Sequence, residues 1–157
     1  MMKILFVCLG NICRSPLAEA IFLHKIMEKG LESRFQVNSC GTADYHIGDS
    51  PDPRTIKNAA RNGVAIKHLG QQLSAEDLRN FDLILPMDAS NYNNILRLEN
   101  AGSYKEKIKL MRSFDPTGRG QDVPDPYNGT EKNFQEVFEI LDRSIEGLIQ
   151  YLVNNEG

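Results

Sequence analysis

The sequence predicts an α/β fold: a single three-layer domain with a central four-stranded parallel sheet and helices on both faces. Apolar runs typical of buried strands alternate with amphipathic segments, which favours parallel strands joined by right-handed helical crossovers. The first apolar run is uninterrupted, as in a strand buried on both faces. With 157 residues the chain suits one domain, so we expect residues 1–157 to form it, with the last few residues as candidates for disorder.

The chain opens with a predicted strand, loop and helix. Residues 3–8 are rich in β-formers and give the first strand. After a polar loop, Ser15 is a good N-cap and Pro16 suits the first helical position. Gly30 is a natural stop for this helix.

The middle of the chain continues the alternation with shorter elements. Strands are expected at residues 35–39 and 81–85, and residues 108–111 read as a weak strand that would complete the sheet. Helices are expected over 54–62, after a capping box at 74–77, and from an Asp88 N-cap to about residue 99. Residues 113–130 read as a long loop, a kind of segment that is often functional.

The last helix has the clearest pattern in the chain. Its apolar side chains recur at helical spacing and form one stripe, which predicts core packing. The members of this stripe are Phe134, Val137, Phe138, Leu141, Ile145, Leu148, Ile149 and Leu152.

The composition excludes several classes of protein. Hydrophobic residues make up 41% and charged residues 25%, which is typical of a soluble globular chain, not a disordered one. The net charge of −3 argues against nucleic acid as a partner. No apolar stretch approaches the roughly 20 residues of a membrane span, and no signal peptide is apparent, so we expect a cytoplasmic protein without a membrane partner. A monomer is a separate expectation, which no feature of the sequence tests. An odd count of three cysteines excludes a disulfide framework and a four-cysteine zinc site.

The segment from Cys8 to Ser15 carries the chemistry. A cysteine ends a buried strand, an arginine follows six positions later, and a helix start comes next. Backbone N–H groups of such a loop, with the helix N-terminus, form an anion cradle. Arg14 can grip two phosphate oxygens, while the donors around Cys8 favour its thiolate, the nucleophilic form.

Each candidate has a plain structural alternative. Cys8 could be a small buried hydrophobe, but Arg14 and the polar loop would then be unexplained. Asp125 stands between Pro124 and Pro126 in the long loop, a common turn signal when taken alone. Beside a cysteine nucleophile, a carboxylic acid that protonates a leaving alkoxide is the better interpretation.

These motifs resemble the low-molecular-weight protein tyrosine phosphatases. The resemblance covers nearly the whole chain, from the Cys8–Ser15 loop through Ser39, His68 and the 81–91 stretch to Asp125-Pro126-Tyr127. It implies a single phosphatase domain that hydrolyses phosphotyrosine proteins or small aryl phosphates without a metal or other cofactor.

The resemblance also implies a role for individual residues. Cys8 would form a phosphocysteine, Arg14 would bind the phosphate, and Asp125 would act as general acid and then as general base. The phosphate-binding loop would comprise Leu9, Gly10, Asn11, Ile12, Cys13, Arg14 and Ser15, supported by Ser15, Asn11, Ser39 and His68. Asn tolerates left-handed backbone angles, which suits Asn11 in a tight loop. The sequence leaves open whether Ser15 serves the thiolate or caps the helix, and whether Asp88 is more than an N-cap.

Two further features follow from the same resemblance. Cys13 is a redox candidate, since a disulfide with Cys8 would protect the nucleophile; alternatively it is a small residue that fills the loop. Apolar walls from Leu9, Ile12, Tyr45 and Tyr127 would form the substrate rim and favour the long phenyl phosphate over phosphoserine.

Two other functions compete with the phosphatase. An arsenate reductase of the same fold would pass electrons through later cysteines, and none follows Cys40. A phosphate-carrying or phosphate-binding module would need neither a general acid nor a base, yet Asp125 is present. The phosphatase is therefore favoured.

Overall fold

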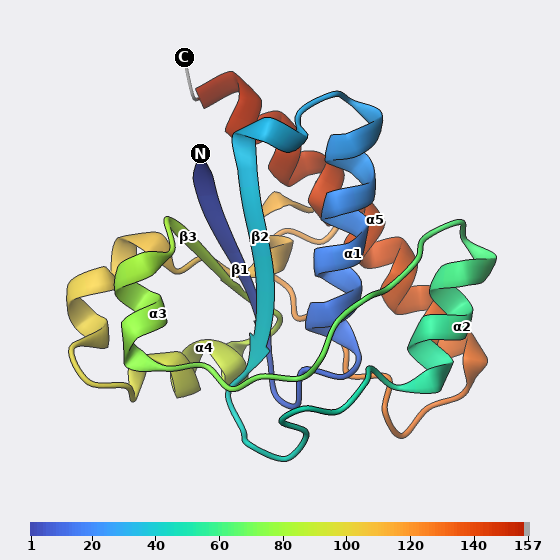
Figure 1. The fold of residues 1–157 in the computed structure, drawn as a ribbon, viewed down its shortest axis with the longest axis horizontal. Coiled ribbons are helices and arrows are strands. Elements are labelled where there is room, and N and C mark those ends of the chain that lie inside the picture. Colours follow the sequence, from blue (N-terminus) through green and yellow to red (C-terminus); the bar gives the residue numbers. More distant parts are fainter. Residues whose placement is uncertain (156–157) are drawn as a thin grey trace.

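The computed structural model describes residues 1–155, and Figure 1 shows their fold. Strands alternate with helices as expected, joined by short 3-10 turns. The strands are β1 Met2–Cys8, β2 Phe35–Gly41 and β3 Leu83–Pro86; the helices are α1 Arg14–Glu28, α2 Pro53–Arg61, α3 Ala75–Asn80, α4 Ala89–Leu96 and α5 Glu131–Asn155; the 3-10 turns are η1 Glu32–Arg34, η2 Ala101–Lys107 and η3 Met111–Phe114. The expected disorder of the last few residues concerns 156 and 157, which lie outside the described residues.

The sheet is parallel but has three strands instead of the expected four, in the order β2-β1-β3. Residues 108–111 do not form a strand: Ile108 makes an isolated bridge to Ile84, and the Lys109 amide donates to the Ile84 carbonyl. Turn η2 ends at Lys107 and turn η3 begins at Met111, so too few extended residues remain between them to continue the ladder.

Side chains of β1 alternate between two apolar cores, one on each face of the sheet. Ile4, Phe6 and Cys8 point into the core that α1 and α5 complete. Leu5 and Val7 point into the core formed with α3, α4 and η2. The expected three layers are therefore present, with α1 and α5 on one side of the sheet and α3 and α4 on the other (Figure 1).

Helix α1 starts two residues earlier than the cap pattern predicts. Its first residue is Arg14 and its N-cap is Cys13, so Ser15 is not the cap. The hydroxyl of Ser15 is instead turned inward, where it is fully buried. Asp88 does cap α4, since its side chain accepts the Asn91 N–H at 2.7 Å.

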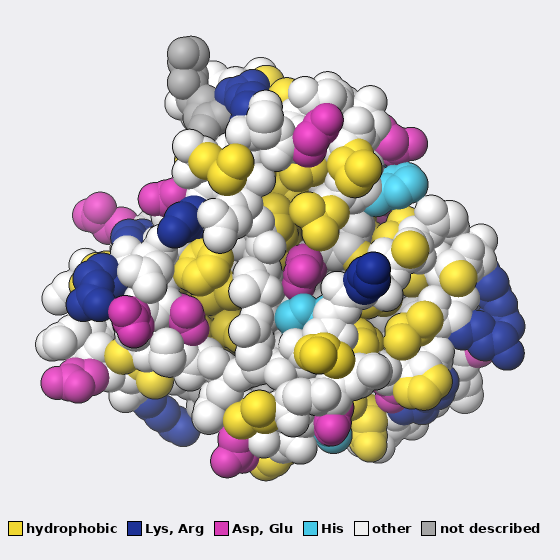
Figure 2. Space-filling model, in the orientation of Figure 1, with side chains coloured by type: hydrophobic (Ala, Val, Ile, Leu, Met, Phe, Trp, Pro, Cys, Tyr) yellow, Lys and Arg dark blue, Asp and Glu magenta, His cyan; other side chains and the backbone are white. Residues whose placement is uncertain are grey.

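The two ends of the sheet carry different parts of the chain. β1 begins and α5 ends at the same end of the molecule, and the carboxyl end of β1 lies at the opposite end (Figure 1). Cys8 therefore opens onto the loops at the end where parallel sheets bind ligands. On the face in Figure 2, acidic and basic side chains are interspersed without a field of one sign. Among residues 1–155, no helix combines the length and apolar content that crossing a membrane requires.

A buried carboxylate fixes the long loop that leads to Asp125. Asp115 has 0% exposure and accepts hydrogen bonds from Arg112 Nε at 2.9 Å and from Arg143 Nε and Nη2 at 2.7 and 3.0 Å. Arg143 stands on α5, and Arg112 Nη1 also donates to the Asp122 carbonyl at 3.0 Å. These hydrogen bonds, those from Arg143 foremost, hold the pKa of Asp115 well below its usual value.

We expect Asp115→Asn to lower the free energy of unfolding at pH 7 by about 3 kcal/mol, because a buried ion pair loses one partner. Since the folded-state pKa of Asp115 is depressed, its stabilisation is complete above the unfolded pKa of about 3.9 and is lost as pH falls through the folded value. Urea unfolding of both proteins across pH 7 to 3 should show their difference shrinking at the acid end. The control is Asp142→Asn, whose half-exposed pair with Lys25 should contribute less than about 1 kcal/mol; an equal loss in both variants would contradict the prediction.

Candidate active site

The loop after β1 curls around the sulfur of Cys8. Asn11 N–H donates to Cys8 Sγ at 3.3 Å, and Ser15 Oγ lies 3.0 Å from the same sulfur. The outer side of the loop is bonded to β2 and its continuation: Thr42 N–H donates to the Cys8 carbonyl and Ala43 N–H to the Leu9 carbonyl. These bonds hold the loop against β2 and its continuation, and a loop from a strand end to a helix start turns its backbone N–H groups toward a bound anion.

Gly41 permits this close approach of β2 to the loop. A Cβ at this position would lie 2.7 Å from the Leu9 carbonyl oxygen and 3.1 Å from the Asn11 nitrogen. Any other residue would push the loop away from the strand. Sequence analysis missed this glycine because nothing in one sequence separates it from a glycine in an ordinary turn.

The backbone conformation and side-chain hydrogen bonds of Asn11 stabilise the shape of the loop. Its φ is 58°, the left-handed conformation expected for it. The side-chain amide donates to Ser15 Oγ at 2.8 Å and to Ser39 Oγ at 3.1 Å. His68 Nε2 donates to Asn11 Oδ1 at 2.7 Å, and Gln71 N–H donates to the same oxygen at 3.0 Å. The residues expected to support the loop therefore meet at one buried amide.

Glu19 completes this network and was missed by sequence analysis. Its Oε1 accepts the Ser39 hydroxyl at 2.7 Å and lies 3.2 Å from His68 Nδ1, and the residue has 8% exposure. A carboxylate there orients the imidazole toward Asn11. The sequence offered one weak signal, a charged residue between two alanines. The first turns of this helix are buried nearly all round, so Glu19 is buried with them.

Arg14 is almost completely buried, with 2% exposure, and is fixed at one end of its guanidinium. Nη1 donates to Asp88 Oδ2 at 2.7 Å and to the Val123 carbonyl at 2.9 Å. Although burial opposes the charge, the Cys8 thiolate and the Asp88 carboxylate hold the pKa of Arg14 above its usual value. Asp88 thus does more than cap α4, since it also anchors this arginine.

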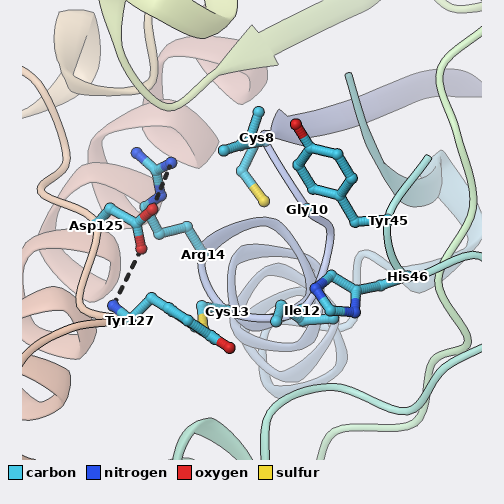
Figure 3. Close-up of a pocket in the computed structure, with 10 residues that line it drawn as sticks. Cys8, Gly10, Ile12, Cys13, Arg14, Tyr45, His46, Asp125 and Tyr127 are labelled. Atoms are coloured by element: carbon cyan, nitrogen blue, oxygen red, sulfur yellow. Dashed lines mark hydrogen bonds and ion pairs between the residues drawn. The ribbon is translucent and has the colours of Figure 1, made fainter. Parts of the chain in front are cut away.

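Asp125 approaches the same guanidinium from the long loop. Its Oδ2 lies 3.7 Å from Arg14 Nη2, and its Oδ1 accepts the Tyr127 N–H at 3.1 Å. The carboxylate is 46% exposed, so it can reach both solvent and a group bound in the pocket. Figure 3 shows Asp125 and Arg14 on one side of the Cys8 sulfur and Tyr45 on the other.

These groups line one cavity of about 330 Å³, which would hold an aryl phosphate. The predicted nucleophile, arginine and acid all line it, as do all the predicted rim residues. The lining residues are Cys8, Leu9, Gly10, Ile12, Cys13, Arg14, Tyr45, His46, Asp125 and Tyr127, of which His46 was not predicted. In the described part of the chain, no group of three or more His, Cys, Asp or Glu side chains is placed to hold a metal ion.

Comparison with known families agrees with this geometry. The sequence model of the low molecular weight phosphotyrosine protein phosphatases matches residues 3–156. The chain belongs to this family. A member from Schizosaccharomyces pombe, named low molecular weight phosphotyrosine protein phosphatase, is 45% identical over 137 residues, which cover 87% of each chain.

Solved structures match this phosphatase-family chain over almost its full length. A protein tyrosine phosphatase from Entamoeba histolytica, with Hepes in its active site, has a TM-score of 0.94 at 40% identity and covers 100% of both chains. The YwlE arginine phosphatase, as a cysteine-to-serine mutant with a phosphorylated active-site serine, has a TM-score of 0.87 at 27% identity and covers 98% of this chain and 97% of its own. Family membership and fold thus agree.

The three cysteines of this phosphatase-family chain are free and differ in surroundings. Burial raises the pKa of Cys13 to about 12, and burial also raises the pKa of Cys40 well above its usual value. We therefore expect iodoacetamide at pH 7.5 to label Cys8, with Cys13 and Cys40 at least about 100-fold slower, because the thiolate is the reactive form. Peptide mass spectrometry measures the labelling of each cysteine, with and without orthophosphate to occupy the loop around Cys8. In 8 M urea, the control, all three cysteines should react. Equal labelling of Cys8 and Cys13 in the native protein would contradict the prediction.

Proposed function

We propose that this chain hydrolyses phosphotyrosine monoesters through a phosphocysteine intermediate. The observation that carries the proposal is the cavity in which the Cys8 thiol, the buried Arg14 guanidinium and the Asp125 carboxylate converge. A nucleophile, an anion clamp and a proton donor are the three parts that phosphoryl transfer to a cysteine requires. Family membership supports the same reaction.

In the proposed reaction, Cys8 Sγ attacks phosphorus in line with the departing aryl oxygen. Arg14 and the N–H groups of residues 9–15 bind the three equatorial oxygens, whose charge they stabilise in the transition state. Asp125 gives its proton to the departing oxygen as the P–O bond breaks. The resulting carboxylate then removes a proton from the water that attacks the phosphocysteine and releases orthophosphate.

The supporting residues act through the loop. Ser15 stabilises the Cys8 thiolate, and Asn11 keeps the loop in its left-handed turn, held by Ser39 and His68. Their roles are proposed from contacts, since each hydrogen bond fixes either the sulfur or the amide below it. Cys13 lines the same cavity, and its disulfide role stays a prediction.

The apolar walls of the cavity set the proposed selectivity. Leu9, Ile12, Tyr45 and Tyr127 give apolar walls above the sulfur, so a phenyl phosphate gains contacts that phosphoserine is too short to make. We further propose that residues 1–157 form a single phosphatase domain that acts as a cytoplasmic monomer, with phosphoproteins or aryl phosphates as partners and neither nucleic acid nor a membrane.

The deciding experiment is a phosphate-release assay on peptides of one sequence carrying phosphotyrosine, phosphoserine or phosphoarginine, with Cys8→Ser as the blank. We expect release from phosphotyrosine and at least about tenfold lower kcat/KM for the other two. Phosphoarginine is included because the chain resembles YwlE. Preference for phosphoarginine or phosphoserine would replace the proposed substrate, and arsenate reduction in a coupled thiol assay would favour the reductase.

A further inference from the structure

Tyr127 forms one wall of the active-site cavity, yet nearly half of the residue is open to solvent. The residue is 47% exposed, and in Figure 3 its ring lies along the edge of the cavity below the Cys8 sulfur. A wall this open needs a support, because a free tyrosine ring would otherwise sample other rotamers. The support that the structure provides is a guanidinium.

Arg54 contacts the Tyr127 ring from outside the cavity. Its Cζ lies 5.4 Å from the ring centroid, and Arg54 is not among the residues that line the cavity. The same Cζ lies 4.7 Å from the centroid of Phe134 on α5. The guanidinium therefore touches two rings, one of which is the cavity wall, in the geometry of cation–π contacts.

The position of Arg54 is fixed relative to the phosphate-binding loop. Its Nε and Nη2 donate to the two carboxylate oxygens of Asp52 at 3.1 and 2.8 Å. Asp52 is 9% exposed, and its own N–H donates to the Ile12 carbonyl at 2.8 Å. A short chain of contacts thus runs from the Ile12 carbonyl of the phosphate-binding loop through Asp52 and Arg54 to the Tyr127 wall.

We infer that Arg54 is a positioning residue that sets the distance between the Tyr127 wall and the phosphate-binding loop and so gives the site its preference for aryl over alkyl phosphates. The planar fork of arginine is needed, since a lysine in its place would keep the charge and lose the two-point hold on Asp52. Arg14, Cys8 and Asp125 are not contacted by Arg54, so the anion site itself should not depend on it.

The chain offers a matched control on the same helix. Arg61 also stands on α2, its side chain is 47% exposed against 46% for Arg54, and it makes an ion pair with Glu131. Both arginines border a small cavity of about 150 Å³ with Phe134. Among residues 1–155, the cation over the Tyr127 ring is Arg54, whereas Arg61 pairs with Glu131. Arg61→Lys therefore changes the same surface chemistry without touching the wall.

The test compares two non-hydrolysable probes by isothermal titration calorimetry: benzylphosphonate, which fills the anion site and the slot, and methylphosphonate, which fills the anion site alone. For Arg54→Lys we expect benzylphosphonate to bind about two- to fivefold more weakly while methylphosphonate is unchanged. Arg61→Lys should bind both probes as the unsubstituted protein does. The thermal midpoints of all three proteins confirm that each is folded.

Three outcomes would overturn the inference: unchanged benzylphosphonate binding in Arg54→Lys, equal weakening of both probes, or the same loss in Arg61→Lys. The inference rests on the proposed function for its link to substrate, and a kinetic arm tests that link. We expect KM for phenyl phosphate to rise with kcat nearly unchanged. If the unsubstituted protein binds benzylphosphonate but hydrolyses no aryl phosphate, the proposed function fails while the binding comparison still decides the role of Arg54.

Discussion

Replacing Cys8 by serine should abolish the turnover of para-nitrophenyl phosphate, lowering kcat by at least about 10⁴-fold. The serine hydroxyl occupies nearly the same place, so the loop and its donors should remain. Its proton, however, is held far more strongly than that of a thiol. Asp125, the carboxyl that lines the cavity with Cys8, must itself be protonated to act as general acid in this step, so it cannot take that proton from serine. The loss should therefore fall on the chemical step, while orthophosphate binds the variant as before.

Steady-state release of para-nitrophenol and calorimetric binding of orthophosphate measure the two halves of this prediction. In the YwlE structure a serine in the active site carries phosphate, so a single slow phosphorylation of the variant is compatible with the mechanism. Cys8→Ala provides binding data without that side reaction. Cys13→Ser, in the same loop, should keep most activity. Undiminished turnover in Cys8→Ser would eliminate the covalent route.

The second large effect is expected for Asp125→Asn. The amide cannot deliver a proton, so kcat/KM for phenyl phosphate should fall by about 10²–10³-fold. With a nitrophenolate, which departs readily as an anion, the loss should be less than about tenfold. The parameter to measure is kcat/KM, because it covers the steps up to phenol departure and excludes the later hydrolysis in which Asp125 acts as base.

A series of aryl phosphates with phenols of graded acidity gives the dependence on leaving group. The control is Asp122→Asn in the same loop, where an amide oxygen can still accept the Ala89 N–H. This variant should behave as the unsubstituted enzyme does across the series. A loss in Asp125→Asn of the same size for every leaving group would mean that the carboxylate positions substrate and does not protonate it.

The centre of the site was predictable because its chemistry lies within a short stretch of sequence. Cys8 and Arg14 are six positions apart between a strand and a helix, and this context limits where their side chains can go. Resemblance to the family added Ser39 and His68, which no local pattern singles out. The structure brings both to the Asn11 amide, as expected.

The remaining features depend on contacts between distant segments. Glu19, Gly41, Asp52 and Asp115 act through partners far along the chain, and one sequence does not record which segments meet. Residue type alone also failed to decide between two possible roles of one side chain. Ser15 matched a cap by type, but the buried sulfur beside it gave its hydroxyl a closer partner.

The prediction of a fourth strand was wrong for a local reason that β-propensity does not capture. Residues 108–111 have the apolar composition of a strand, but 3-10 turns on both sides confine the extended backbone to a single bridge with Ile84. Strand formation needs several successive pairs, and the flanking turns remove them. The sheet edge beyond β3 is thus bordered by turns instead of a ladder.

The start of β1 and the end of α5 share one end of the molecule, opposite the carboxyl end of β1 (Figure 1). Cys8, at that carboxyl end, lines the cavity. A bead, a sensor chip or a fused carrier attached at either extremity would therefore leave the mouth of the site open to a bulky folded phosphoprotein. Immobilised enzyme should capture such substrates in either attachment geometry.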